Sequence, residues 1–201
     1  MDDAVQSLRA RRHLDTHREI HRAALDLFEA QGVRETTVPQ IAERAGVSPR
    51  TFFRHFAAKE HAALAGQARL TAAVDALEVD ARDAPSAVLR AVESAVVTAM
   101  ADADDTELDE RRRIARLLER EPDLRALAAA QDAALAERLR ARLTAVLDQP
   151  DPLVVRLLFE VAATMWKVSW DRWSELVHAD PGADAGEVMR RCSAALRVVV
   201  R

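Results

Sequence analysis

The sequence is poor in several residue types that define other kinds of protein. Its 201 residues include one cysteine, which excludes an internal disulfide framework and fits a reducing compartment. It has five glycines and no tyrosine, and no Asn-Gly or Asp-Gly turn marks a β-hairpin. No apolar run reaches the roughly 18 residues of a membrane span, and the N-terminus lacks the apolar segment of a secretory signal. We therefore expect a cytoplasmic protein with no membrane partner.

Charge is divided unevenly along the chain. The formal net charge is −4, which by itself argues against a nucleic-acid partner. Residues 1–60, however, carry 10 Lys and Arg against 9 Asp and Glu, with four of the six histidines, whereas residues 61–201 carry 19 against 24. An anionic partner is therefore expected for the N-terminal part only.

Apolar residues recur at helical spacing over most of the chain. Leu135, Leu139, Leu143 and Leu147 are one such series. We predict an all-α protein of about nine helices. The predicted helices cover about 15–31, 38–45 and 49–55, one from about 58, one over 86–101, one on each side of Glu121-Pro122, one from 152 to about 178, and one after Gly182.

Two short helices near residue 50 are predicted to form a helix-turn-helix. Thr37-Val-Pro-Gln40 has the pattern of a capping box, and Ser48-Pro49 opens the next helix in the same way. Gly46 permits the left-handed backbone of a tight turn between them. Phe52 and Phe56, four residues apart, are expected to anchor the second helix on the first long helix, because such a short helix is marginal alone.

Residues 36–60, together with the preceding helix IHRAALDLFEAQGV, resemble the TetR family of bacterial transcriptional regulators. The residues that carry the resemblance are Thr37, Ile41, Ala42, Ala45, Gly46, Val47, Ser48, Thr51, Phe53, His55, Phe56, Lys59 and Glu60. One position departs from the family pattern, because Phe53 stands where a tyrosine is usual. The phosphate hydrogen bond of that hydroxyl is lost, while van der Waals contact with the DNA backbone is retained.

The resemblance implies that the outer face of residues 49–55 contacts DNA. Arg50 is the candidate for a base-edge contact, since bidentate pairing with guanine is the commonest specific contact of arginine. Arg54 suits either a base or a phosphate, and Thr51, His55 and Lys59 are assigned to phosphates. A solvated surface role remains an alternative for the arginines and for His55. The predicted contact set is Thr37, Ser48, Pro49, Arg50, Thr51, Phe53, Arg54, His55 and Lys59.

The resemblance also implies an assembly and a mode of control. Residues 1–62 would form the DNA-binding domain and residues 63–201 a ligand-binding and dimerisation domain. Two chains would bind a palindromic operator in double-stranded DNA, with the last two helices forming the homodimer interface. A small-molecule effector would enter the second domain and release DNA, so the expected protein is a repressor. The stretch 111–127 is faintly similar to mycofactocin-associated regulators of the family.

Three tryptophans form one stripe on the helix predicted from residue 152. Their spacing of four and three residues is equally suited to core or dimer packing and to the wall of an apolar pocket. If they line a pocket, its effector is expected to be largely apolar, with Arg116, Arg120 and Lys167 as candidate polar anchors. The candidate pocket residues are Arg116, Arg120, Met165, Trp166, Trp170 and Trp173.

Other features leave alternatives open. Arg9, Arg11 and Arg12 form either an unfolded arm that contacts DNA or a solvated tail. His13, His17 and His21 share one helix face, which favours a solvated or phosphate-facing stripe over a metal site, because no Cys or Glu cluster accompanies them. Cys192 suits apolar packing.

The rival functions are a DNA-binding protein without an effector and an all-α enzyme. No glycine-rich phosphate loop, Ser-His-Asp order or metal-ligand set supports an enzyme, so we expect no catalytic residue, metal or cofactor.

Overall fold

The computed structural model describes residues 2–65, 68–101, 105–148, 151–180 and 182–199. Over these residues the chain is all-α, as predicted, with ten helices and no strand. The predicted helix from about residue 58 is two helices, α4 and α5, because the chain leaves helical conformation after Ala63. The helices are α1 Asp2–Glu35, α2 Val38–Arg44, α3 Pro49–His55, α4 Lys59–Ala63, α5 Ala68–Asp75, α6 Pro85–Ala101, α7 Asp105–Arg120, α8 Pro122–Val146, α9 Pro152–Ala179 and α10 Ala185–Val199.

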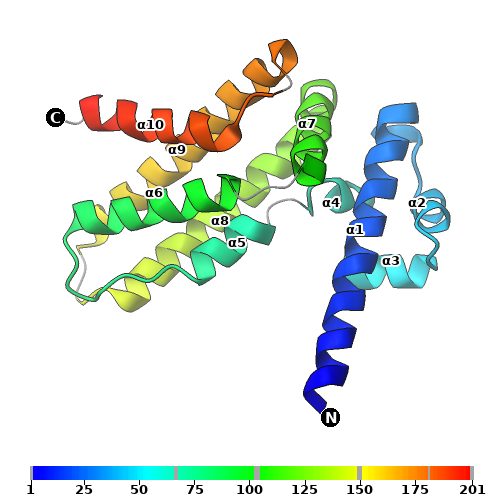
Figure 1. The fold of residues 1–201 in the computed structure, drawn as a ribbon, viewed down its shortest axis with the longest axis horizontal. Helices are drawn as coiled ribbons and strands as arrows, with labels where there is room; N and C mark the ends of the chain where they lie inside the picture. The colour runs from blue at the N-terminus through cyan, green and yellow to red at the C-terminus, as the bar shows by residue number, and fades with distance from the viewer. Residues whose placement is uncertain (1, 66–67, 102–104, 149–150, 181, 200–201) are drawn as a thin grey trace. The chain divides into compact units, whose positions relative to one another are not determined.

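The chain forms two compact units. The first, which we call the head, comprises residues 1–66 and 109–127, and the second, the body, comprises residues 67–108 and 128–201. The head therefore includes most of α7 and the start of α8 in addition to α1 to α4 (Figure 1). The predicted division at residue 62 concerns function and remains a prediction.

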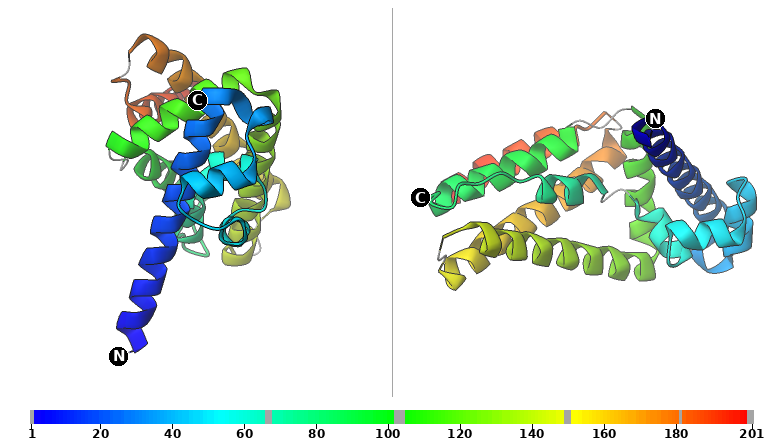
Figure 2. Two further views of the ribbon diagram at one scale, coloured as in Figure 1. Left: turned by 90° about the vertical axis from the view of Figure 1, so that its right-hand side faces the viewer. Right: turned by 90° about the horizontal axis from the view of Figure 1, so that it is seen from below.

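The first helix begins earlier than the sequence analysis placed it. We expected a start near Asp15 after an arm or tail, whereas α1 is helical from Asp2, and its first turns extend past α3 (Figure 2). No glycine or proline interrupts residues 2–31, and Ala, Leu and Arg are good helix formers. The predicted stop is confirmed: Gly32 has φ 83°, a left-handed conformation that ends the regular helix.

The head has an apolar core between α1 and its neighbours. Ile20 and Phe28 of α1, Ile41 of α2 and Phe52 of α3 are all buried, at 0–2% exposure. Ile114 of α7 is buried as well. This core fixes one face of the helix-turn-helix, and the opposite face of the helix-turn-helix is exposed to solvent.

The body has a separate core made by four helices. Its buried side chains come from α5, α6, α8 and α9 and include Val88, Leu143 and Leu158. The helix α10 packs on α6 and α9 (Figure 1). None of the described helices is long and apolar enough to cross a membrane.

Candidate nucleic-acid interface

Local capping bonds hold α2 and α3 in place. The predicted capping box is confirmed: the Thr37 N–H donates to Gln40 Oε1 at 2.8 Å, and the Gln40 N–H donates to Thr37 Oγ1 at 3.4 Å. Gly46 adopts φ 67°, the left-handed turn expected of it. Ser48 Oγ accepts from the Thr51 N–H at 3.1 Å and caps α3. These bonds satisfy N–H groups that a helix start leaves unpaired.

The helix α3 has one buried and one exposed face. Phe52 is fully buried and Phe56 is 7% exposed, which confirms that both anchor the helix to the core. Phe53 is 58% exposed although it is a large apolar side chain. Arg50 and Arg54 are exposed beside it, and no described residue forms a hydrogen bond or ion pair with either guanidinium.

The remaining predicted contact residues surround this exposed face. Thr37, Ser48 and Pro49 are exposed at the starts of α2 and α3. Thr51 is half-buried, and its hydroxyl lies 3.0 Å from that of Ser48. These hydroxyls take part in the local caps and retain lone pairs or a proton for a further partner.

Lys59 makes bonds that the sequence did not indicate. Its ammonium donates to the carbonyl oxygens of Val33 at 2.6 Å and Thr36 at 2.7 Å, with the Arg34 carbonyl at 3.5 Å. The three protons of the ammonium thus point at the carbonyls that follow the end of the regular α1 helix. In this structure the Lys59 side chain acts as a C-terminal cap of α1, and its predicted phosphate contact stays a prediction.

Histidine rings gather between α1 and α3. The His55 ring stacks on His13, with centroids 4.3 Å apart, and lies 6.1 Å from His17. His17 also packs against Phe56 at 4.3 Å. Burial and the neighbouring histidines His55, His21 and His13 lower the pKa of His17 to about 4. Burial, His13 and Arg54 likewise lower the pKa of His55.

The third histidine of the stripe is part of the core. His21 is 5% exposed, and its Nδ1 lies 2.6 Å from the Ala62 carbonyl oxygen, so we assign the proton to Nδ1. Its Nε2 lies 3.7 Å from Glu110 of α7. Burial lowers the pKa of His21 despite the Ala62 bond and the Glu110 charge.

Charge pairs fasten α7 to α1. Arg113 donates to Asp26 at 2.6 Å and to Glu29 at 2.8 Å, with 15% of its side chain exposed. Arg44 of α2 donates to the same Asp26 at 2.8 Å. Although burial opposes ionisation, the hydrogen bonds from Arg44 and Arg113 lower the pKa of Asp26. The sequence contained no local signal for these contacts, because the partners are 18 to 87 positions apart.

Comparison with known proteins identifies this region. Residues 20–65 match the family described as bacterial regulatory proteins, tetR family. The matched segment, which contains the helix-turn-helix, is therefore similar to the TetR family. A curated relative, the HTH-type transcriptional regulator TcmR of Streptomyces glaucescens, is 42% identical over 123 residues, which are 58% of this chain and 54% of that protein. The chain thus spans about half the length of this relative.

Solved structures of TetR-family proteins are also similar. FadR of Thermus thermophilus, a transcriptional repressor in complex with lauroyl-CoA, has 28% identity and a TM-score of 0.48 over 92% of this chain and 93% of that one. PfmR of Thermus thermophilus has 23% identity and a TM-score of 0.44 over 86% and 93%. Both TM-scores are below 0.5, so the similarity of the head to the TetR family depends on the sequence matches.

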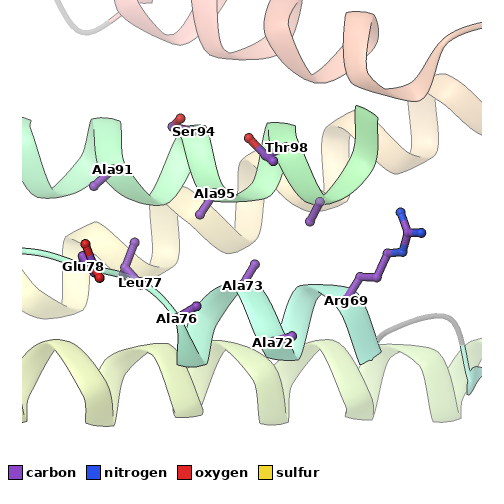
Figure 3. Close-up of a pocket in the computed structure, with 11 residues that line it drawn as sticks. Arg69, Ala72, Ala73, Ala76, Leu77, Glu78, Ala91, Ser94, Ala95 and Thr98 are labelled. Carbon is purple, nitrogen blue, oxygen red and sulfur yellow. The ribbon is translucent and has the colours of Figure 1, made fainter. Parts of the chain in front are cut away.

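The body contains a cavity of about 670 Å³ between α5 and α6, which is widely open to solvent. Ala73 of α5 and Ala91 and Ala95 of α6 point into the space between the helices (Figure 3). Arg69 lies at one end and is paired with Glu107 at 2.5 Å. The lining residues are Arg69, Ala72, Ala73, Ala76, Leu77, Glu78, Ala91, Ser94, Ala95, Thr98 and Ala99. Alanine has no distinctive sequence signal, so the sequence analysis did not single these residues out.

The six predicted pocket residues are not among those that line this cavity. Arg116 and Arg120 belong to the head, where Arg116 pairs with Glu29 at 3.3 Å. Met165 is buried at 3% exposure.

The tryptophans do form the expected stripe, with ring centroids 5.8 and 5.2 Å apart. Trp173 is fully buried and donates to the Ala183 carbonyl at 3.0 Å, and Trp166 donates to Asp132 at 3.2 Å. These contacts suit packing inside the body. Among the described side chains, no group of three or more His, Cys, Asp or Glu is arranged to hold a metal ion.

Proposed function

We propose that this chain is a cytoplasmic transcriptional regulator that binds double-stranded DNA through its TetR-family head. The observation that carries the proposal is the exposed face of α3. Arg50, Phe53 and Arg54 lie there together, backed by the buried Phe52. A short, well-anchored helix with arginines on its outer face has the form required to enter a major groove. The family of the head and the curated relative TcmR support the same reading.

The test is a DNA-binding measurement on a duplex selected by the protein from a random library. Arg50→Ala should weaken binding to that duplex by about 1–3 kcal/mol and relax the preference at one position of each half-site. Its effect on random DNA should be smaller. Arg140→Ala, which removes an arginine of 42% side-chain exposure from α8, is the matched control and should change neither. Equal weakening of selected and random DNA by Arg50→Ala would contradict the base contact.

We propose further that two chains bind DNA together through α9 and α10. Leu153 and Leu157, one turn apart on α9, are 63% and 56% exposed, and Val198 of α10 is 75% exposed. Such apolar surface is suited to an isologous interface between two copies. Sedimentation should give the mass of two chains at micromolar concentration, and Leu157→Asp should give monomers with unchanged helix content. A monomeric wild-type protein would contradict the dimer and the palindromic operator.

The alanine-lined cavity is our candidate effector site. Its volume suits a small molecule, and its largely apolar lining with Arg69, Ser94 and Thr98 suits an apolar ligand with few polar groups. We expect binding there to oppose DNA binding, so that the effector releases the regulator from DNA, as in the repressor that the sequence analysis predicted. A thermal-shift screen detects ligands of the folded state.

A variant in which a larger side chain fills the cavity provides the control for that screen. Ala95→Leu should abolish the thermal shift and the release of DNA by any ligand found, whereas Ala130→Leu at an exposed position of α8 should preserve both. A ligand that still releases DNA from the Ala95→Leu protein would place the effector site elsewhere. The absence of any ligand would favour the effector-independent alternative.

A further inference from the structure

The rings of His13, His17 and His55 form a cluster at the junction of α1 and α3. Of these three residues, only His55 belongs to the predicted DNA-contact set. His13 is exposed on α1, His17 is half-buried one turn later, and His55 is the last residue of α3. The His55 ring lies 4.3 Å from that of His13 and 6.1 Å from that of His17, and His13 and His55 are stacked with 21° between their planes. The Nδ1 atom of His55 is shielded from solvent and has no hydrogen-bond partner among the described residues.

The charged groups around this histidine cluster are mainly basic. Arg54 precedes His55 in α3, and its charge lowers the pKa of His55; Arg11 and Arg12 are exposed on α1 close to His13 in sequence. No described carboxylate forms an ion pair with any ring of the cluster.

Charged side chains of both signs surround His21. His21 is the next histidine along α1 and is faced by Glu110 and Arg113 of α7 and by Arg22 of α1 itself. Among the described residues, Glu110 is the carboxylate whose charge acts on a histidine of this stripe, and it acts on His21.

This arrangement disfavours a proton in the absence of an anion. A protonated His17 or His55 would be partly buried and repelled by charge on the neighbouring histidines, which is why the pKa of His17 and that of His55 are both lowered. At neutral pH these two rings are therefore uncharged. An anion within about 4–6 Å of His55 would favour the protonated ring over the neutral one, because opposite charges attract.

We propose that His13, His17 and His55 form a phosphate-binding site that takes up a proton when DNA binds. This inference depends on the proposed function, since it needs α3 to lie against a DNA backbone. A phosphate next to the end of α3 would meet His55 directly and the stacked His13 behind it. Mutual repulsion among the rings admits about one proton per head, so affinity for DNA must rise as the pH falls.

The test is the affinity for the selected duplex at constant ionic strength, measured by fluorescence anisotropy. We expect the dissociation constant to fall about three- to tenfold from about pH 7.5 to about pH 6.0. His55→Gln and His13→Gln should each remove most of that dependence. His13→Gln changes an exposed residue and keeps the test valid if His55→Gln impairs folding. His178→Gln, which removes a histidine from α9, is the control and should retain the dependence, and circular dichroism at each pH confirms that the head is folded.

The possible outcomes distinguish a failure of this inference from a failure of the proposed DNA-binding function. Specific binding that does not change with pH, or a pH dependence that both cluster variants retain, would overturn the inference and leave the DNA-binding function intact. A protein that selects no duplex at either pH would overturn the proposed function together with the inference.

Discussion

Replacing Lys59 by methionine should destabilise the head, because the ammonium caps the end of α1. The bonds to Val33 and Thr36 are short, at 2.6 and 2.7 Å, and Thr36 is fully buried. Methionine keeps most of the apolar stem, so the substitution removes the polar contacts with little loss of packing.

The magnitude follows from the number and environment of the lost bonds. A hydrogen bond to a charged group contributes about 1.5–3 kcal/mol, and the half-buried position of Lys59 favours the lower end of that range. The Val33 carbonyl still accepts from the Thr36 N–H at 3.3 Å, so one of the two carbonyls keeps a partner. We expect a loss of about 2–3 kcal/mol in the free energy of unfolding of the head.

Urea denaturation followed by two signals measures this loss. Circular dichroism reports all helices, whereas tryptophan emission reports the body, since all three tryptophans lie on α9. The dichroism midpoint of the head should fall by about 1 M urea. Lys167→Met is the matched control, because Lys167 is the other of the two lysines and forms an exposed pair with Asp171. It should change stability by less than about 0.5 kcal/mol.

If Lys59 instead contacts a DNA phosphate, as predicted from the sequence, the Lys59→Met protein should give the opposite result. In that case Lys59→Met would leave the unfolding midpoint unchanged and would lower the salt slope of DNA binding by about one unit. Unchanged stability would therefore refute the cap and restore Lys59 to the DNA contacts.

Three further predictions concern the head. Phe53→Tyr should leave the melting temperature unchanged and tighten DNA binding by about 0.5–1.5 kcal/mol through one phosphate hydrogen bond; loss of folding would show that Phe53 is needed in the core. Arg113→Met should lower the stability of the head by about 1–3 kcal/mol, because Asp26 and Glu29 lose a partly buried partner, and unchanged urea denaturation would contradict this. Stability should also fall as the pH drops from about 6.5 toward 4, since unfolded His17 binds a proton near its ordinary pKa and folded His17 only near 4. After discounting for solvent exposure we expect about 1–2 kcal/mol, and a His17→Gln protein with the same acid profile would argue against it.

The helix-turn-helix was predictable from sequence because its determinants are local. Thr37, Gly46 and Ser48 act on backbone groups within three positions or on their own φ angle. Phe52 and Phe56 lie four positions apart on a helix and so share a face whatever the rest of the chain does. The same argument predicts the tryptophan stripe of α9, although not which partner it faces.

Tertiary structure decided the features that depend on distant partners. The membership of residues 109–127 in the head, the capping role of Lys59 and the stacking of His13 on His55 join positions 23 to 89 apart. The alanine-lined cavity likewise exists only because α5 and α6 meet along their small residues. The sequence by itself determined helices, caps and the TetR-like recognition element, since short-range sterics and hydrogen bonding suffice for these. Which charged and aromatic side chains become partners was settled only when apolar faces packed, because burial selects the faces and the polar groups at their edges must then pair.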